Sequence, residues 1–371
     1  MNMERANLVT PSPMDIHRPP CPVIRPVRKM RFVFDNIRSM MEQEAKHYTP
    51  SMDYVSADLS QLDPAKLKDR VTEGWRRKLC EWIYGVVDHF GFDREVASIA
   101  LGYLDRYSSK LTEISGQTVS KREFQLYAVT CLYIAVKIHG ETDVLEGPRL
   151  KLKISAFQEL SRGFFTSKVI EATERQILTT LMWHLNPPTS AQFVAYYLRL
   201  LPEWSLYENQ RSYEEAATRI FDTAKYLTEL AVCISRFTFE SRPSIVAYAS
   251  VLCAIDSLHA LIPYDVRVQF LNNIAEATLV LLPATEPVVR TKAMLMDLFA
   301  SSPQDVQDYD TSYLAYHRNM ETSTKREGIE EVGGKVSPVS VCENNPLAAA
   351  REPLPKRSRT CENQADDHPT I

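Results

Sequence analysis

Two stretches of the chain are apolar on nearly every side of the helix that each would form. Residues 121–138 read KREFQLYAVTCLYIAVKI, and residues 244–258 read SIVAYASVLCAIDSL. A helix without a polar face is stable only when other helices surround it. A shift of 119 residues superimposes the two stretches and places Ala128 on Ala247. We therefore predict two bundles of about five helices, each built around a buried third helix.

The remaining pattern is also helical, which predicts an all-α fold. Apolar residues recur at a spacing of three to four along residues 79–90, 94–107, 166–182 and 214–234. The chain has 11 glycines and contains neither an Asn-Gly nor an Asp-Gly step. These steps are the strongest short signals for β-hairpins.

Breaks in composition set the expected domain boundaries. Asn186-Pro187-Pro188 interrupts the helical pattern, and Thr189 can cap the helix that follows. Proline-rich and polar segments at the two ends predict disorder. The expected organisation is a disordered tail over 1–30, an N-terminal helix with the first bundle over 31–187, the second bundle over 188–300, and a disordered tail over 301–371.

Charge and cysteine spacing argue against several classes of partner. With 43 basic and 47 acidic residues, the net charge is -4, so nucleic acid is an unlikely general partner. No apolar run of 18 residues occurs, which predicts no membrane association. The seven cysteines stand singly without a CxxC pair, so we expect no metal site and reduced thiols in an intracellular protein.

No arrangement of residues suggests catalysis. The chain lacks a glycine-rich phosphate loop, a His-x-x-x-His pair and a nucleophile elbow. We therefore predict a protein that is not an enzyme and needs no cofactor.

Four short motifs occur in a specific order. They are WRRKLCEW at 75–82, YLDRY at 103–107, AVK at 135–137, and TERQIL at 173–178 followed by LNPPT at 185–189. Together they resemble the cyclin family over roughly residues 32–300. The resemblance implies the cyclin fold with tandem cyclin boxes. It also implies a regulatory subunit that binds and activates a cyclin-dependent serine/threonine kinase and so controls cell-cycle progression.

The resemblance assigns kinase contacts to the first box. The lysine and glutamate that match Lys137 and Glu174 bind the kinase backbone in the family, and Ile138 stands where an aromatic residue packs on the kinase. Without the resemblance, Lys137 reads as a solvated lysine at a helix C-terminus and Glu174 as a surface residue. The second box has Asp256 and Ala293 near the positions equivalent to Lys137 and Glu174. Only the first box is therefore expected to bind the kinase through such a lysine and glutamate.

Two further sets of residues follow from the resemblance. Arg76 and Asp105 are expected to form a buried ion pair that ties the first two helices of the box together. Some cyclins also hold a docking peptide of substrates or inhibitors on the first helix. The expected docking patch here is Trp75, Leu79, Trp82 and Gln125, of which Leu79, Trp82 and Gln125 match the family. Trp75, Lys78 and Gly85 depart from the usual pattern, and the alternative is an ordinary half-exposed helix face.

Three expectations concern the ends of the chain and its role. Residues 32–47 are expected to form an N-terminal helix with one apolar stripe. This helix either only covers the second bundle or also touches the kinase. The basic cluster at 356–359 is either a nuclear import signal or a solvated run, and we expect the nucleus and cytoplasm as locations. The alternative function is a cyclin-fold transcription or adaptor protein without kinase activation.

Overall fold

The computed structural model describes residues 28–56, 69–116, 118–140, 152–203, 210–258 and 261–301. Within these ranges all regular secondary structure is helical, and the only strand-like feature is an isolated antiparallel bridge between Arg70 and Ser120. The predicted all-α class is therefore confirmed. The tails predicted to be disordered lie outside the described residues, except that 28–30 and 301 belong to helices.

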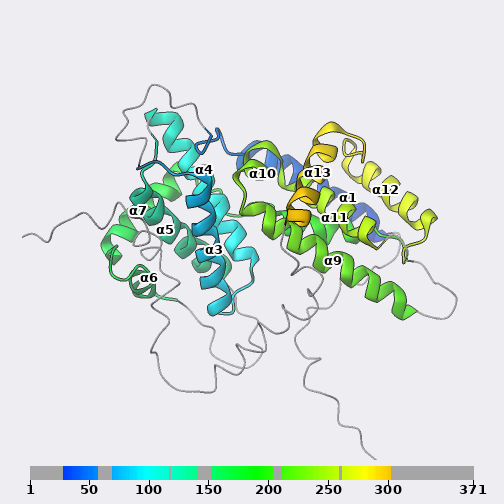
Figure 1. Cartoon of the computed structure of the whole chain (residues 1–371), viewed down its shortest axis with the longest axis horizontal. Coiled ribbons are helices and arrows are strands. Elements are labelled where there is room, and N and C mark those ends of the chain that lie inside the picture. Colours follow the sequence, from blue (N-terminus) through cyan, green and yellow to red (C-terminus); the bar gives the residue numbers. More distant parts are fainter. Residues whose placement is uncertain are drawn as a thin grey trace, which may run out of the picture.

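The first bundle surrounds the buried helix predicted at 121–138. Its helices are α3 (Glu73–His89), α4 (Glu95–Ser115), α5 (Lys121–His139), α6 (Ile154–Leu160) and α7 (Ser167–Thr180). Helix α5 packs on all four others (Figure 1). A capping box begins it, because Ser120 accepts a hydrogen bond from the Glu123 amide while the Glu123 side chain accepts one from the Ser120 amide.

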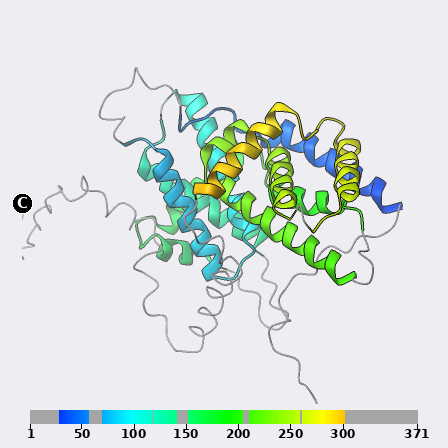
Figure 2. The ribbon, with the colours of Figure 1, turned by 45° about the vertical axis from the view of Figure 1, so that its right-hand side comes forward.

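The second bundle repeats this plan around the second apolar segment. Its helices are α8 (Ser190–Leu198), α9 (Gln210–Val232), the short α10 (Ser235–Glu240), α11 (Pro243–Ser257), α12 (Tyr264–Thr278) and α13 (Glu286–Ser301). Helix α11 contacts α8, α9 and α13. Figure 2 shows the two groups of helices side by side along the long axis.

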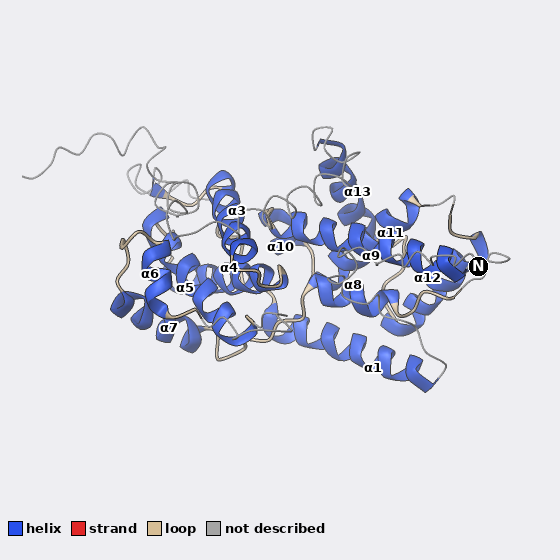
Figure 3. Cartoon of the chain, turned by 90° about the horizontal axis from the view of Figure 1, so that it is seen from below, coloured by secondary structure: helices blue, strands red, loops and turns tan. Residues whose placement is uncertain are grey.

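The N-terminal helix α1 (Arg28–Gln43) packs on the second bundle, although it precedes the first in sequence. Its buried Val33 and Ile37 belong to the core of the second bundle. Arg38 donates hydrogen bonds to the carbonyl oxygens of Glu276 and Ala277 at the end of α12. Figure 3 shows α1 lying along this bundle. Of the two roles predicted for 32–47, the structural one is present.

A short π-helix, η2 (Glu44–Tyr48), continues α1 toward the junction of the bundles. The linker between the bundles is fixed there as well. Thr189 caps α8, as its sequence predicts, by accepting a hydrogen bond from the Gln192 amide at 3.1 Å. Its hydroxyl and the Gln192 side chain both donate to Glu95 of α4 at 2.7 Å, so the linker is bound to the first bundle.

Candidate functional site

Lys137 and Glu174 meet on the surface of the first bundle. Lys137 lies in the last turn of α5, and Glu174 lies on α7, which packs against it. The Lys137 Nζ to Glu174 Oε1 distance is 3.0 Å; the lysine side chain is 55% exposed and the glutamate side chain 13%. The hydrogen bond to Glu174 raises the pKa of Lys137. Each group keeps further hydrogen-bonding capacity for a partner, because an ammonium carries three N–H bonds and a carboxylate two oxygens.

Ile138 is the next residue and its side chain is 45% exposed. Gly140 then ends the helix with its amide bonded to the Val136 carbonyl oxygen at 2.9 Å. A Cβ atom on residue 140 would overlap that same oxygen, so this helix end requires glycine. The local sequence therefore presents a cation and an aliphatic side chain together at one helix terminus.

Sequence patterns did not single out Met182 and Trp183, which follow α7. Both have positive φ angles, 50° and 60°, in the left-handed region where bulky residues are rare. Both side chains are about 70% exposed. The Trp183 amide donates to the Leu178 carbonyl oxygen, which is the type of bond that closes a helix where glycine is usual. Two large apolar side chains are thus exposed to solvent on a strained backbone. Residues with strained backbone angles occur more often at functional sites.

A hydrogen-bonded cluster joins this turn to the end of α5. His139 Nε2 lies 2.8 Å from the Leu185 carbonyl oxygen, and the Tyr103 hydroxyl of α4 donates to the same oxygen. His139 is two residues beyond Lys137, and Leu185 is two residues beyond Trp183. The cluster therefore fixes the segment that follows the Met182–Trp183 turn to the C-terminal end of α5. We call Lys137, Ile138, Glu174 and Trp183 the first-bundle face.

The second bundle carries a counterpart with the charges exchanged. Asp256 near the end of α11 forms an ion pair with Lys292 of α13. Alignment of the repeats places Ala293 near the equivalent of Glu174, but its neighbour Lys292 is the residue that pairs. The tertiary structure therefore supplies Asp256 with a partner that the alignment of the repeats did not indicate. The two bundles present opposite polarity at equivalent places.

The ion pair between Arg76 and Asp105 is buried at the junction of the bundles. Arg76 Nε lies 3.0 Å from Asp105 Oδ1, and Nη2 lies 2.6 Å from Oδ2. The Tyr54 hydroxyl also donates to this carboxylate at 2.7 Å. Arg76 Nη2 further donates to the Val232 carbonyl oxygen and the Thr238 hydroxyl of the second bundle. The pair therefore ties together α3, α4 and the second bundle, not the first two helices alone.

The four residues proposed to hold a docking peptide are core residues of the first bundle. Trp75, Leu79, Trp82 and Gln125 are between 0% and 7% exposed. Lys121 Nζ also lies over the Trp75 ring, 5.5 Å from its centroid. Peptide docking at this face stays a prediction, and it would require these side chains to become more exposed than they are in the free chain.

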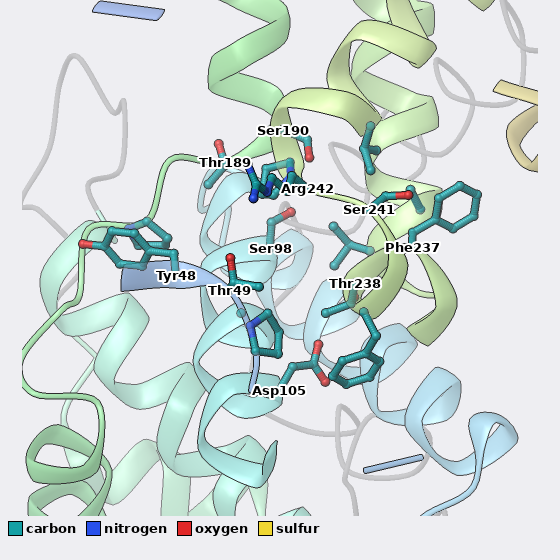
Figure 4. A pocket seen from close by; sticks show the side chains of 18 of the residues that line it. Tyr48, Thr49, Ser98, Asp105, Thr189, Ser190, Phe237, Thr238, Ser241 and Arg242 are labelled. Carbon is teal, nitrogen blue, oxygen red and sulfur yellow. The ribbon is translucent and has the colours of Figure 1, made fainter. Parts of the chain in front are cut away.

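A cavity of about 290 Å³ lies between the two bundles (Figure 4). Its lining includes Ser98 and Asp105 of α4, Thr189 of the linker, Phe237 of α10 and Arg242. Asp105 is paired with Arg76 and Thr189 with Glu95, so these polar groups already serve the fold. We assign the cavity to the structural junction.

The described ranges contain no group of three or more His, Cys, Asp or Glu side chains arranged to hold a metal ion. The helices of that part of the chain include none that is long and apolar enough to cross a membrane.

Comparison with known proteins matches the chain to cyclins. The family model described as "Cyclin, N-terminal domain" matches residues 35–186. Cyclin-D4-1 of Oryza sativa subsp. japonica is 30% identical over 226 residues, which cover 60% of this chain and 56% of that protein. Cyclin-D1-1 of Arabidopsis thaliana is 26% identical over 232 residues, 61% of this chain and 58% of that protein. G1/S-specific cyclin-E of Caenorhabditis elegans is 30% identical over 192 residues, 49% of this chain and 34% of that protein.

The chain spans at most about three fifths of the length of these relatives. Among solved structures, a viral cyclin from herpesvirus saimiri matches with a TM-score of 0.49 and 17% identity, covering 71% of this chain and 97% of that one.

Proposed function

Because the chain is a member of the cyclin family, we propose that it is a regulatory subunit that binds and activates a cyclin-dependent serine/threonine protein kinase. In this role it controls cell-cycle progression and carries out no catalysis itself. Activation requires no chemistry from the chain. A partner that binds the active state of the kinase more tightly than the inactive state shifts the population toward the active one.

The observation that carries the proposal is the Lys137–Glu174 pair, in which the lysine is 55% exposed and the glutamate 13%. Because solvent reaches the lysine, the pair is expected to contribute only about 1 kcal/mol to folding. Here the two groups are already oriented. Ile138, the residue after Lys137, is exposed, and Trp183 is exposed on the turn whose following segment is bonded to the end of α5. Charged groups next to apolar anchors are what a protein-binding surface requires. We assign kinase binding to the first-bundle face.

The double variant Lys137→Ala/Glu174→Ala tests the assignment. We expect its affinity for a purified cyclin-dependent kinase to fall at least about 30-fold, which corresponds to the loss of about 2 kcal/mol at a binding hot spot. Kinase activity at limiting subunit should fall in parallel. Affinity is measured by surface plasmon resonance, and activity by phosphate transfer to a peptide with a Ser-Pro site.

The chain offers a matched control in the exchanged ion pair of the second bundle. Asp256→Ala/Lys292→Ala removes an equivalent pair and is expected to bind and activate the kinase as the wild type does. If both double variants bind equally well, the first-bundle face is not the kinase site. If the folded wild-type chain binds no kinase of this class, the adaptor or transcription role replaces the proposal.

Trp183→Ala is expected to weaken kinase binding at least about tenfold, because buried tryptophans are frequent hot spots of interfaces. The side chain is 69% exposed in the free chain, so its loss should leave the thermal unfolding midpoint almost unchanged. Ile114→Ala, which removes another exposed apolar side chain at the end of α4, is the control. Equal affinity of the two variants would show that Trp183 lies outside the interface.

A further inference from the structure

Two cysteines from different bundles meet at the junction. Cys80 lies on α3 of the first bundle and is completely buried, whereas Cys233 directly follows α9 of the second and is partly exposed. Cys233 packs against the core of the first bundle, to which Cys80 belongs. Arg76, one helical turn before Cys80, donates to the carbonyl oxygen of Val232, the residue before Cys233, so both thiols lie where α3 contacts the end of α9. A separation of 153 positions in the sequence hid this pairing from any spacing motif.

The surroundings favour a thiolate on the accessible member of the pair. The hydrogen bond from Cys80 lowers the pKa of Cys233, and the nearby Arg76 guanidinium lowers it further against the opposing effect of burial. That hydrogen bond and burial raise the pKa of Cys80, so Cys80 keeps its proton. Arg76 donates to the carbonyl oxygen of Val232, the residue before Cys233, at 2.9 Å. Its Nη1 is buried with no hydrogen-bond partner among the described residues.

We propose that Cys80 and Cys233 form a peroxide-sensitive dithiol, which oxidises to a disulfide that joins the two bundles. The site needs an accessible nucleophile and a second thiol within reach, and the junction supplies both. A thiolate is the form of cysteine that attacks an oxidant, and Cys233 is the member of the pair that solvent reaches. The co-reactant is hydrogen peroxide or another hydroperoxide.

The reaction proceeds in two balanced steps. The Cys233 sulfur attacks one oxygen of hydrogen peroxide, the O–O bond breaks, and the departing hydroxide takes up a proton to leave as water. The sulfur of Cys80 then attacks the sulfenic acid on Cys233, the S–O bond breaks, and a second water leaves with the Cys80 proton. The two sulfurs lose two electrons in total, and the peroxide gains them.

The disulfide would add a covalent bond where Arg76 already contacts the second bundle through Val232 and Thr238. It would close a loop of about 150 residues in the unfolded chain, which restricts the unfolded ensemble and raises thermal stability. The inference does not depend on kinase binding, so it can fail or succeed independently of the proposed function.

The full chain, treated with a modest excess of hydrogen peroxide, tests the proposal. After alkylation and tryptic digestion, we expect a cross-linked species of peptides 79–94 and 226–236, each of which contains one cysteine. The intact mass should fall by about 2 Da, which is the loss of two hydrogens on disulfide formation. The thermal midpoint should rise by several degrees and return after reduction.

Cys253→Ser is the matched control. Cys253 is also partly buried, but burial raises the pKa of its thiol to about 11, so it stays protonated. This variant should form the cross-link as the wild type does, whereas Cys233→Ser should not form it and should show no stabilisation by peroxide. Cys233 is partly exposed, so its replacement avoids the cavity that a Cys80 variant would create.

Two results would overturn the proposal. One is Cys233 oxidised to sulfinic or sulfonic acid while Cys80 is still alkylated as a free thiol. The other is a peroxide-treated wild type in which both cysteines are recovered as free thiols or the cross-link joins a different pair.

Discussion

Asp105→Asn is expected to lower the free energy of unfolding by about 3–5 kcal/mol, which is the usual effect of removing one partner from a buried ion pair. The Arg76 side chain is fully buried and would remain charged without its counter-ion. The Tyr54 hydroxyl would also lose its charged acceptor. Because Arg76 also contacts Val232 and Thr238, the loss should loosen the contact between the bundles. Urea unfolding followed by circular dichroism measures the effect.

Glu113→Gln is the control on the same helix. Glu113 pairs with Lys110, and both side chains are nearly half exposed, so this change should leave the free energy of unfolding almost unchanged. The double variant Arg76→Met/Asp105→Leu should recover much of the lost stability, because it removes both buried charges together. If Asp105→Asn costs no more than Glu113→Gln, the Arg76–Asp105 pair does not fasten the junction.

The free energy of unfolding of the wild type is expected to fall by about 2–3 kcal/mol as the pH rises from 5 to 8. This loss comes from one side chain, Glu44, because its pKa in the folded chain is about 7. Glu44 is buried beneath the N-terminus of α11, where its carboxyl group accepts hydrogen bonds from the Ser244 amide and hydroxyl. Burial raises its pKa from 4.5 to about 7, and this outweighs the opposing effects of Ser244 and Arg242.

The direction follows from proton binding. Between pH 4.5 and 7 the folded chain holds a proton on Glu44 that the unfolded chain has released. The stabilising contribution is therefore complete below pH 4.5 and is lost as the pH rises through 7. Glu44→Gln, which is neutral at every pH, should remove this part of the pH dependence in urea unfolding at pH 5, 6, 7 and 8.

Glu42→Gln is the control for Glu44. Its side chain is exposed in a pair with Lys46, which lowers the pKa of Glu42 and moves its titration below the tested range. This variant should keep the wild-type pH dependence. If Glu44→Gln also keeps it, the Glu44 carboxyl group is ionised throughout and the N-terminal helix is not held by a protonated acid.

Much of the helical architecture could be predicted from the sequence because its signals are local. The apolar segments at 121–138 and 244–258 became α5 and α11 almost to the residue. Thr189 caps α8 as predicted, and Thr166 caps α7 in the same way, because a cap depends only on the three residues that follow it. The family resemblance also rested on short local motifs. Helix α10, by contrast, has six residues, too few for a periodic pattern to be recognised.

Contacts between distant residues were decided by the tertiary structure alone. Glu44 reaches Ser244 across 200 residues, and Cys80 meets Cys233 across 153. The partner of Asp256 proved to be Lys292. The exposed Trp183 lies on a left-handed turn that no sequence pattern predicted. The sequence by itself determined which helices form and which sides of them are buried, because period and capping are properties of neighbouring residues. Which side chains meet depends on how the buried sides pack together, and only the assembled bundles fix that.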